Sequence, residues 1–316
     1  MRKNARRKPV LDGKVVVITG SNVGIGKETA VGLASTGATV VLACRNEEKA
    51  TAAAADVSNR SGNEDVRVVE LDLADLASVR ACAEEITRRW ARLDVLINNA
   101  GGMWTERDTT VQGLERTFGV NHVGHFYLTR LLLDRLKTSA PSRIINVASA
   151  GHHAAWRGMR WDDLQTERRY TAMRAYVPSK LANVLFTRGL ARRLDPQQVT
   201  ANALHPGTIR SGFGMDGDVK RLMALGMRIV RPFLISSARG ARTSIYLASD
   251  PSVEGTTGGY WVRRHPGHMS RIARDDRNAD RLWDESERLL ASVGFPVQPT
   301  DLAVTSPSQR ETLARG

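Results

Sequence analysis

The sequence predicts an α/β fold in which one doubly wound parallel β-sheet is covered by helices on both faces. Three observations predict it. Short β-branched runs alternate with longer segments of helical periodicity, no linker interrupts the alternation, and no internal repeat is present. With 316 residues and 41% hydrophobic content, the chain is long enough to bury a full core. We therefore expect one domain rather than two.

Seven apolar runs are expected to form the strands of this sheet. They are residues 14–19, 39–44, 66–70, 95–98, 143–148, 199–204 and 259–262, with helices between them. The domain is expected over 11–291, after a basic arm at 1–10. A tail at 292–316 contains several prolines among Ser and Thr, so we expect it to wrap loosely or to be disordered.

A glycine-rich turn follows the first expected strand. Residues 20–26 read Gly-Ser-Asn-Val-Gly-Ile-Gly and lead into a helical stretch at 27–36. Glycines let the backbone approach a pyrophosphate, which the N–H groups and dipole of a helix N-terminus attract. This order of strand, turn and helix is typical of a Rossmann-like dinucleotide site. The expected contacts are Gly20, Ser21, Asn22, Gly24, Ile25 and Gly26.

Arg45 follows the second expected strand, roughly 20 residues after the glycine turn, where an acid would bind a free ribose 2′-hydroxyl. A guanidinium there is a bidentate partner for a 2′-phosphate. The position favours NADP(H) over NAD(H) as the cofactor. The alternative is a solvated surface charge.

Tyr176, Lys180 and Ser149 together predict a proton-transfer site for a carbonyl. A free phenol has a pKa of about 10, and a nearby positive charge lowers it toward neutral pH. Lys180 lies one helical turn after Tyr176 and supplies that charge. Ser149 directly follows an apolar run, so its hydroxyl is expected at a strand end, holding a substrate oxygen. The alternative is that Tyr176 and Lys180 are solvent-exposed residues at the start of a helix and serve solubility only.

With these residues the chain resembles the short-chain dehydrogenase/reductase family, and within it the retinol dehydrogenase-like branch. The resemblance extends from about Leu11 to Leu290. Its motifs are Thr19-Gly20-x-x-x-Gly24-x-Gly26, Asn98-Asn99-Ala100-Gly101, Asn121, Ser149, Tyr176, Lys180 and His205-Pro206-Gly207-Thr208. The assignment to this branch rests on three segments, which are Ala-Cys-Arg at 43–45, Ser-Lys-Leu-Ala-Asn at 179–183 and Arg-Leu-Trp-Asp-Glu-Ser-Glu at 281–287.

The resemblance implies an NAD(P)-dependent alcohol dehydrogenase or carbonyl reductase (ketoreductase) that passes a hydride between nicotinamide and a carbonyl or alcohol carbon. It implies that Tyr176 transfers the proton, that Lys180 binds the nicotinamide ribose, and that Asn121 holds a water in a proton relay. Ser149 orients the carbonyl. Further cofactor contacts implied by the resemblance are Asp72, Leu73, Asn98, Ala100, Gly101, Tyr176, Lys180, Pro206, Gly207 and Thr208.

The resemblance also places a substrate lid at about 208–240. Four apolar residues there have helical spacing, which indicates a pocket for a lipophilic or natural-product substrate, or alternatively a core or oligomer contact. They are Leu222, Leu225, Ile229 and Phe233. The opposite wall is expected from His152, His153, Trp156 and Trp161. No Cys or acid accompanies these histidines at metal-ligand spacing, so we expect no metal site.

Formal net charge is +13, and five cations fall within residues 1–8. Such an arm attracts nucleic acid or anionic lipid, but no nucleic-acid-reading motif accompanies it, so we expect no specific nucleic-acid partner. The sequence has no run of about 18 apolar residues, no signal-peptide pattern and only two cysteines. These features predict a cytoplasmic protein without a transmembrane segment.

Partners expected from the sequence are a small-molecule carbonyl or alcohol and a second copy of the chain in a homo-oligomer. Two alternative functions stay open at this point. One is a catalytically silent dinucleotide-binding protein that acts through a partner. The other is a basic scaffold that binds an anionic surface.

Overall fold

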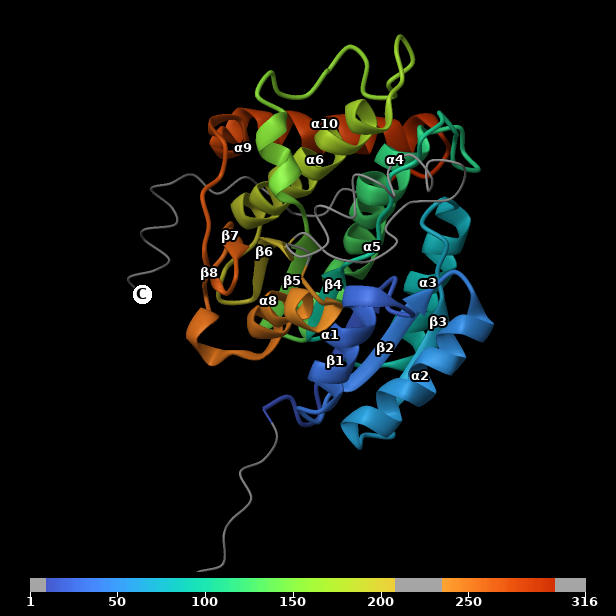
Figure 1. Cartoon of the computed structure of the whole chain (residues 1–316), viewed down its shortest axis with the longest axis vertical. Coiled ribbons are helices and arrows are strands. Elements are labelled where there is room, and N and C mark those ends of the chain that lie inside the picture. Colours follow the sequence, from blue (N-terminus) through green and yellow to red (C-terminus); the bar gives the residue numbers. More distant parts are fainter. Residues whose placement is uncertain (1–9, 208–234, 299–316) are drawn as a thin grey trace, which may run out of the picture.

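A computed structural model describes residues 10–207 and 235–298, whose strands form one sheet in the order β3-β2-β1-β4-β5-β6-β7-β8 (Figure 1). Neighbouring strands are parallel except β7 and β8. The strands are β1 (Val15–Thr19), β2 (Thr39–Cys44), β3 (Val66–Glu70), β4 (Val95–Asn98), β5 (Ser142–Val147), β6 (Val199–His205), β7 (Tyr260–Val262) and β8 (His265–Pro266).

The α-helices are α1 (Gly24–Ala34), α2 (Glu47–Ser61), α3 (Leu76–Arg89), α4 (Arg116–Phe118), α5 (Gly124–Thr138), α6 (Ala172–Arg193), α8 (Ser237–Ser249), α9 (Arg271–Arg274) and α10 (Asp276–Ser292). Two short 3₁₀ turns are η2 (Ala150–Ala154) and η4 (Pro251–Val253), and η1 (Gly119–Val123) is a π-helical turn between α4 and α5.

The predicted α/β class with a doubly wound parallel sheet is confirmed. Each of the seven expected strands agrees with the structure to within one residue at either end. β8 was not predicted, because two residues are too short to show an alternating pattern. α1 begins at Gly24, three residues before the expected start, so Gly24 and Gly26 belong to its first turn.

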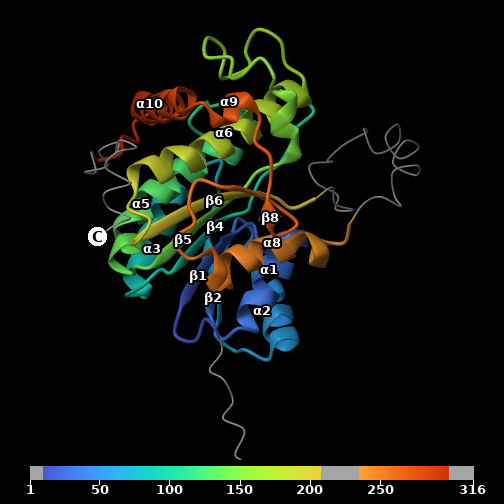
Figure 2. The ribbon, with the colours of Figure 1, turned by 90° about the vertical axis from the view of Figure 1, so that its left-hand side faces the viewer.

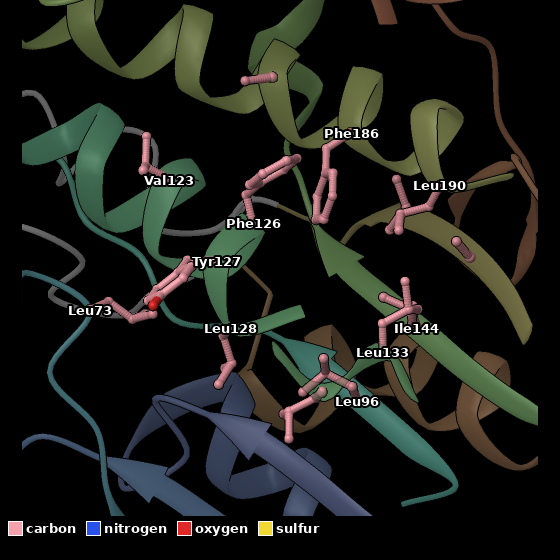
Figure 3. Close-up of a cluster of buried hydrophobic side chains, with 14 of the residues drawn as sticks. Leu73, Leu96, Val123, Phe126, Tyr127, Leu128, Leu133, Ile144, Phe186 and Leu190 are labelled. Atoms are coloured by element: carbon pink, nitrogen blue, oxygen red, sulfur yellow. The ribbon is translucent and has the colours of Figure 1, made fainter. Parts of the chain in front are cut away.

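Helices cover both faces of the sheet, with α3, α5 and α6 on one side and α1, α2 and α8 on the other (Figure 2). Alternate residues of β1 enter the two cores: Val15 and Val17 face the first, and Val16 and Ile18 the second. Figure 3 shows the first core, where α5 and α6 meet through aromatic side chains that come from both helices. Burial on both faces explains why the central strands read as continuous apolar runs.

α10 lies across the outer side of α6 (Figure 1). Its Trp283 is buried with the ring of Phe186 6.1 Å away, centroid to centroid. Three arginines of α6 pair with acids of α10: Arg188 and Arg192 with Asp276, the second at 2.6 Å, and Arg193 with Asp280 at 2.9 Å. An apolar contact and a row of ion pairs therefore join the last described helix to α6.

The packed chain continues beyond the predicted domain end at 291. After α10, Phe295 packs edge-on against Tyr127, with ring centroids 6.0 Å apart, and the guanidinium of Arg80 lies over its ring. The carbonyl of Gln298 accepts a hydrogen bond from Arg130. The expected loose tail thus does not begin at 292, because an apolar side chain and a buried arginine hold this segment.

Residues 1–9 of the expected basic arm, 208–234 of the expected lid and 299–316 of the expected tail lie outside the described residues. They include Leu222, Leu225, Ile229 and Phe233 of the expected lid face. The end of the expected lid, from Ser237, forms the first turn of α8. Within residues 10–207 and 235–298, no helix combines the length and apolar character that crossing a bilayer requires.

Candidate active site

A cavity of about 260 Å³ opens at the carboxyl ends of β1, β2 and β4. In doubly wound sheets this edge is where ligands bind. The predicted cofactor contacts that line it are Gly20, Asn22, Arg45, Asp72, Leu73, Ala100 and Gly101. We refer to it as the β1–β4 cavity.

The glycine turn brings α1 against the strand ends at the β1–β4 cavity. Gly20 has φ +62°, and a Cβ atom there would lie 2.8 Å from Cβ of Ala100. A Cβ atom on Gly26 would lie 2.5 Å from the carbonyl oxygen of Gly20. The N-cap residue of α1, Val23, makes no side-chain hydrogen bond to the helix. The first backbone N–H groups of α1 are therefore suited to bind an anion such as a pyrophosphate. The glycine turn thus fits a dinucleotide.

Two predicted cofactor contacts turn their side chains away from the β1–β4 cavity. Ser21 is fully buried and its hydroxyl donates to the carbonyl of Ile18. The Asn98 amide donates to Thr129 and to Asn146 inside the protein, at 3.0 and 2.8 Å. The Asn98 side chain bridges neighbouring strands because a buried amide needs hydrogen-bond partners, and the contact of this residue with the cofactor stays a prediction.

Thr19 and Asn99 join the ends of β1 and β4. The Thr19 hydroxyl accepts hydrogen bonds from the backbone N–H groups of Asn99 and Ala100, at 2.9 and 3.0 Å. The Asn99 side chain donates to the carbonyls of Thr19 and Gly20. These bonds hold the glycine turn and the segment after β4 in one arrangement.

Cations dominate the charge of the β1–β4 cavity. Arg45 lines it as expected, together with Lys49 of α2 and Arg116 of α4. Asp72 is the carboxylate on its wall, and it accepts a hydrogen bond from the backbone of Ala74. Lys49 and Arg116 were missed by the sequence analysis. For Lys49 a signal existed, since it lies only four residues after Arg45, in the first turn of α2.

α6 begins at Ala172, where the hydroxyl of Thr171 caps the helix, so Tyr176 lies in its second turn. Pro178 follows inside the helix and lacks the N–H that would bond to the carbonyl of Arg174. Arg160 donates to that carbonyl instead, at 2.6 Å. The substitute donor keeps the helix intact between Tyr176 and Lys180.

Ser149 and Tyr176 form a hydrogen-bonded pair. Ser149 follows β5 as the N-cap of η2, and its hydroxyl also accepts a bond from the N–H of Gly151 at 3.0 Å. Burial raises the pKa of Tyr176, and the hydrogen bond from Ser149 opposes this rise. The phenol therefore stays protonated at neutral pH.

Lys180 is fully buried on α6, and its ammonium donates to the carbonyl of Val147 at 3.3 Å. Nζ lies 5.7 Å from the ring centroid of Tyr176. Burial lowers the pKa of Lys180 to about 8. The lowered pKa of Tyr176 that we expected from Lys180 is not found, because desolvation of the phenolate is the largest effect on this group.

Asn121 lies in the π-helical turn η1. Its side-chain oxygen accepts from the N–H of Gly102 at 2.8 Å, and its amide donates to Gly102 and to the hydroxyl of Ser179, both at 2.9 Å. A Cβ atom on Gly101 would lie 2.9 Å from Oδ1 of Asn121 and 3.3 Å from Nζ of Lys180. Gly101 also lines the β1–β4 cavity, so the predicted catalytic residues gather beside it.

The four residues between Ser149 and Tyr176 that we expected to form the substrate-pocket wall opposite the lid do not lie on a single surface. His152 is buried, and its Nδ1 donates to the carbonyl of Ser149 at 2.8 Å. Trp156 is 69% exposed. The rings of His152 and His153 lie against each other at a tilt, with centroids 3.9 Å apart, and the guanidinium of Arg281 lies over the ring of Trp161.

The cofactor contacts expected after β6 are described only in part. Pro206 and Gly207 are half-buried and are not on the wall of the β1–β4 cavity, and Thr208 lies outside the described residues. Gly207 has φ +99°, a conformation that favours glycine. Across the described ranges, no three His, Cys, Asp or Glu side chains are arranged to hold a metal ion.

Comparisons with known proteins agree with this geometry. A family model described as short chain dehydrogenase matches residues 14–161. Retinol dehydrogenase 12 of Homo sapiens is 46% identical over 280 residues, which cover 89% of this chain and 87% of that protein. The chain belongs to the short-chain dehydrogenase/reductase family. It is a retinol dehydrogenase-like member, as the motifs at 43–45, 179–183 and 281–287 predicted.

Two solved structures align over most of the chain. A crystal structure of an uncharacterized protein from Mycobacterium paratuberculosis is 36% identical, with a TM-score of 0.72, and the match covers 92% of this chain and 97% of that one. The active-site complex of Pseudomonas aeruginosa RhlG with NADP is 26% identical, with a TM-score of 0.63, and the match covers 80% and 96%.

Two buried histidines should make this short-chain dehydrogenase/reductase sensitive to mild acid. Burial lowers the pKa of His122 to about 3 and that of His125 to about 4, so both are neutral in the folded protein. In the unfolded chain each binds a proton near pH 6.5, so protonation favours unfolding as the pH falls. Between pH 6.5 and 5 each histidine should remove about 1.5 kcal/mol from the free energy of unfolding.

Denaturant unfolding at both pH values, on the wild type and on His122→Phe, measures this effect. The variant should lose about 1.5 kcal/mol less than the wild type over this interval. An equal loss in the two proteins would show that His122 is not held neutral.

Proposed function

We propose that this chain is an NADP(H)-dependent carbonyl reductase or alcohol dehydrogenase acting on CH–OH groups. The observation that carries the proposal is the meeting of Ser149, Tyr176 and Lys180 beside a cavity with a glycine turn and a cationic wall. When bound, the nicotinamide cofactor supplies a hydride to the carbonyl carbon, or takes it from an alcohol.

The proton chemistry belongs to residues of the chain. Tyr176, which burial keeps protonated, donates its proton to the carbonyl oxygen, and Ser149 holds that oxygen through its hydroxyl. The ammonium of Lys180 then stabilises the phenolate. A protonated phenol at rest is the form needed for reduction, which we propose as the cellular direction.

Three cations support the preference for NADP(H) over NAD(H). Arg45, Lys49 and Arg116 line the β1–β4 cavity, and a 2′-phosphate adds about two negative charges that charge-assisted hydrogen bonds would hold. Pseudomonas aeruginosa RhlG, which is 26% identical to this chain, has been solved in a complex with NADP, which supports the same preference. Homo-oligomerisation and cytoplasmic localisation stay predictions.

We propose a lipophilic substrate, such as a retinoid, another long-chain aldehyde or a natural-product ketone. The apolar helical spacing within 208–240 and the names of the retinol dehydrogenase relatives support this class. A panel of such carbonyls, with NADPH oxidation as the readout, tests the function. Cofactor binding without turnover of any member would favour the catalytically silent alternative.

A charge on the predicted lid face should separate small substrates from large ones. Ile229→Asp should raise KM for a long-chain aldehyde and leave KM for a small aldehyde and the affinity for NADPH nearly unchanged. The reason is that an unpaired charge against an apolar ligand costs several kcal/mol. An equal loss on both substrates, or a collapse of the melting temperature, would assign this face to the core.

A further inference from the structure

His125 lies in the first turn of α5 with both ring nitrogens in hydrogen bonds. Nδ1 is 3.2 Å from the carbonyl oxygen of Asn121, and Nε2 is 2.9 Å from the hydroxyl of Thr19. The side chain is buried. His125 thus joins the end of β1, where the glycine turn begins, to the π-helical turn that carries Asn121.

The hydrogen bonds around Thr19 decide the tautomer of His125. The Thr19 hydroxyl already accepts from two backbone N–H groups, those of Asn99 and Ala100, so both lone pairs are used. Its one hydrogen then needs an acceptor, and Nε2 of His125 at 2.9 Å is closer than the carbonyl of Ile97 at 3.5 Å. The carbonyl of Asn121 can only accept, so Nδ1 carries the hydrogen. One neutral tautomer satisfies every partner.

A π-helical turn lies directly before the segment of α5 that carries His125. In η1 the N–H of Gly124 donates to the carbonyl of Gly119, five residues earlier, so the register of helical bonds is shifted there. His125 supplies an N–H to Asn121 within this segment. The amide of Asn121 in turn binds Gly102 and Ser179, next to Lys180.

We propose that His125 is a positioning residue that holds Asn121 in place beside Lys180 through the hydrogen bond from its Nδ1 to the carbonyl of Asn121. The proposal rests on the proposed function, since it gives His125 a share in that reaction without contact with the substrate. A neutral imidazole fits this task because it donates at one nitrogen and accepts at the other. Burial favours the neutral form most strongly by lowering the pKa of His125, and the charge of Lys180 acts in the same direction.

Three substitutions separate the two hydrogen bonds of His125. His125→Phe removes both, His125→Asn keeps a donor near the position of Nδ1, and His125→Gln keeps a polar group near that of Nε2. His122→Phe is the matched control, because His122 is equally buried in the preceding turn but its Nε2 bonds to Ser286 of α10.

We expect kcat to fall about tenfold or more in His125→Phe and His125→Gln, with KM for NADPH within about threefold of wild type. His125→Asn and His122→Phe should keep kcat within about threefold. Equal losses in the Asn and Gln variants, or a loss in His125→Phe no larger than in His122→Phe, would overturn the proposal. Melting curves correct each rate for the folded fraction.

Hydrogen exchange tests the same proposal without turnover. The N–H of Gly102 donates to Asn121, so in His125→Phe the peptide that contains Gly102 should exchange about tenfold faster than in His122→Phe. Unchanged exchange would contradict the positioning role. If the wild type reduces no carbonyl, the proposed function fails while the exchange result still decides the role of His125.

Discussion

Tyr176→Phe should bind NADPH as the wild type does and lose nearly all turnover. The substitution deletes the proton donor and the hydrogen bond to Ser149, while the ring still fills its buried position. Lys180 keeps its bond to the carbonyl of Val147. Loss of the principal acid should cost well over 1.4 kcal/mol of transition-state stabilisation, so kcat/KM should fall by more than about tenfold.

Steady-state kinetics with NADPH and the best carbonyl of the panel measure this loss. Tyr170→Phe is a matched control, because the Tyr170 hydroxyl donates to the carbonyl of Trp104 rather than to Ser149. The control should keep most of the wild-type rate. A Tyr176→Phe enzyme with more than about a tenth of wild-type kcat/KM would remove Tyr176 from the role of acid.

Arg45→Asp should move cofactor preference from NADPH toward NADH by about tenfold to a hundredfold, since charge-assisted bonds contribute roughly 1.5–3 kcal/mol. The new carboxylate repels a 2′-phosphate and accepts a bond from a free ribose hydroxyl. Lys49 and Arg116 stay on the wall of the β1–β4 cavity, so NADPH binding should weaken without disappearing.

The ratio of kcat/KM for NADPH to that for NADH, measured in wild type and variant, tests this expectation. Arg88→Asp makes the same charge change on an exposed residue of α3 that is not on the wall of the β1–β4 cavity. The Arg88 variant should leave the ratio unchanged. If the Arg45 variant has the same ratio as the wild type, Arg45 does not bind the 2′-phosphate and is only a surface charge.

Local patterns in the sequence were enough to predict the strands, the glycine turn and the positions of Tyr176 and Lys180. β-branched runs, glycines between a strand and a helix, and a one-turn spacing all act over a few residues. The placement of Ser149 at the ligand-binding edge of the sheet needed only the rule that parallel strands end at one edge, since Ser149 directly follows an apolar run.

Properties that depend on distant parts of the chain could not be predicted. The direction of the Asn98 side chain depends on Thr129 and Asn146, which the fold alone brings near. The pKa of Tyr176 depends on how deeply the folded protein buries the phenol. Arg160, which donates to the carbonyl left free by Pro178, comes from a loop whose path no periodicity reveals.

The position of α10 across α6 has a consequence for the order of events during synthesis. A ribosome releases the chain from its N-terminus, so the helix that carries Tyr176 and Lys180 emerges long before Trp283. Until then the side of α6 that Trp283 covers is exposed to solvent, where apolar surface attracts other nascent chains or a chaperone. α6 therefore reaches its native surroundings only after synthesis has passed α10.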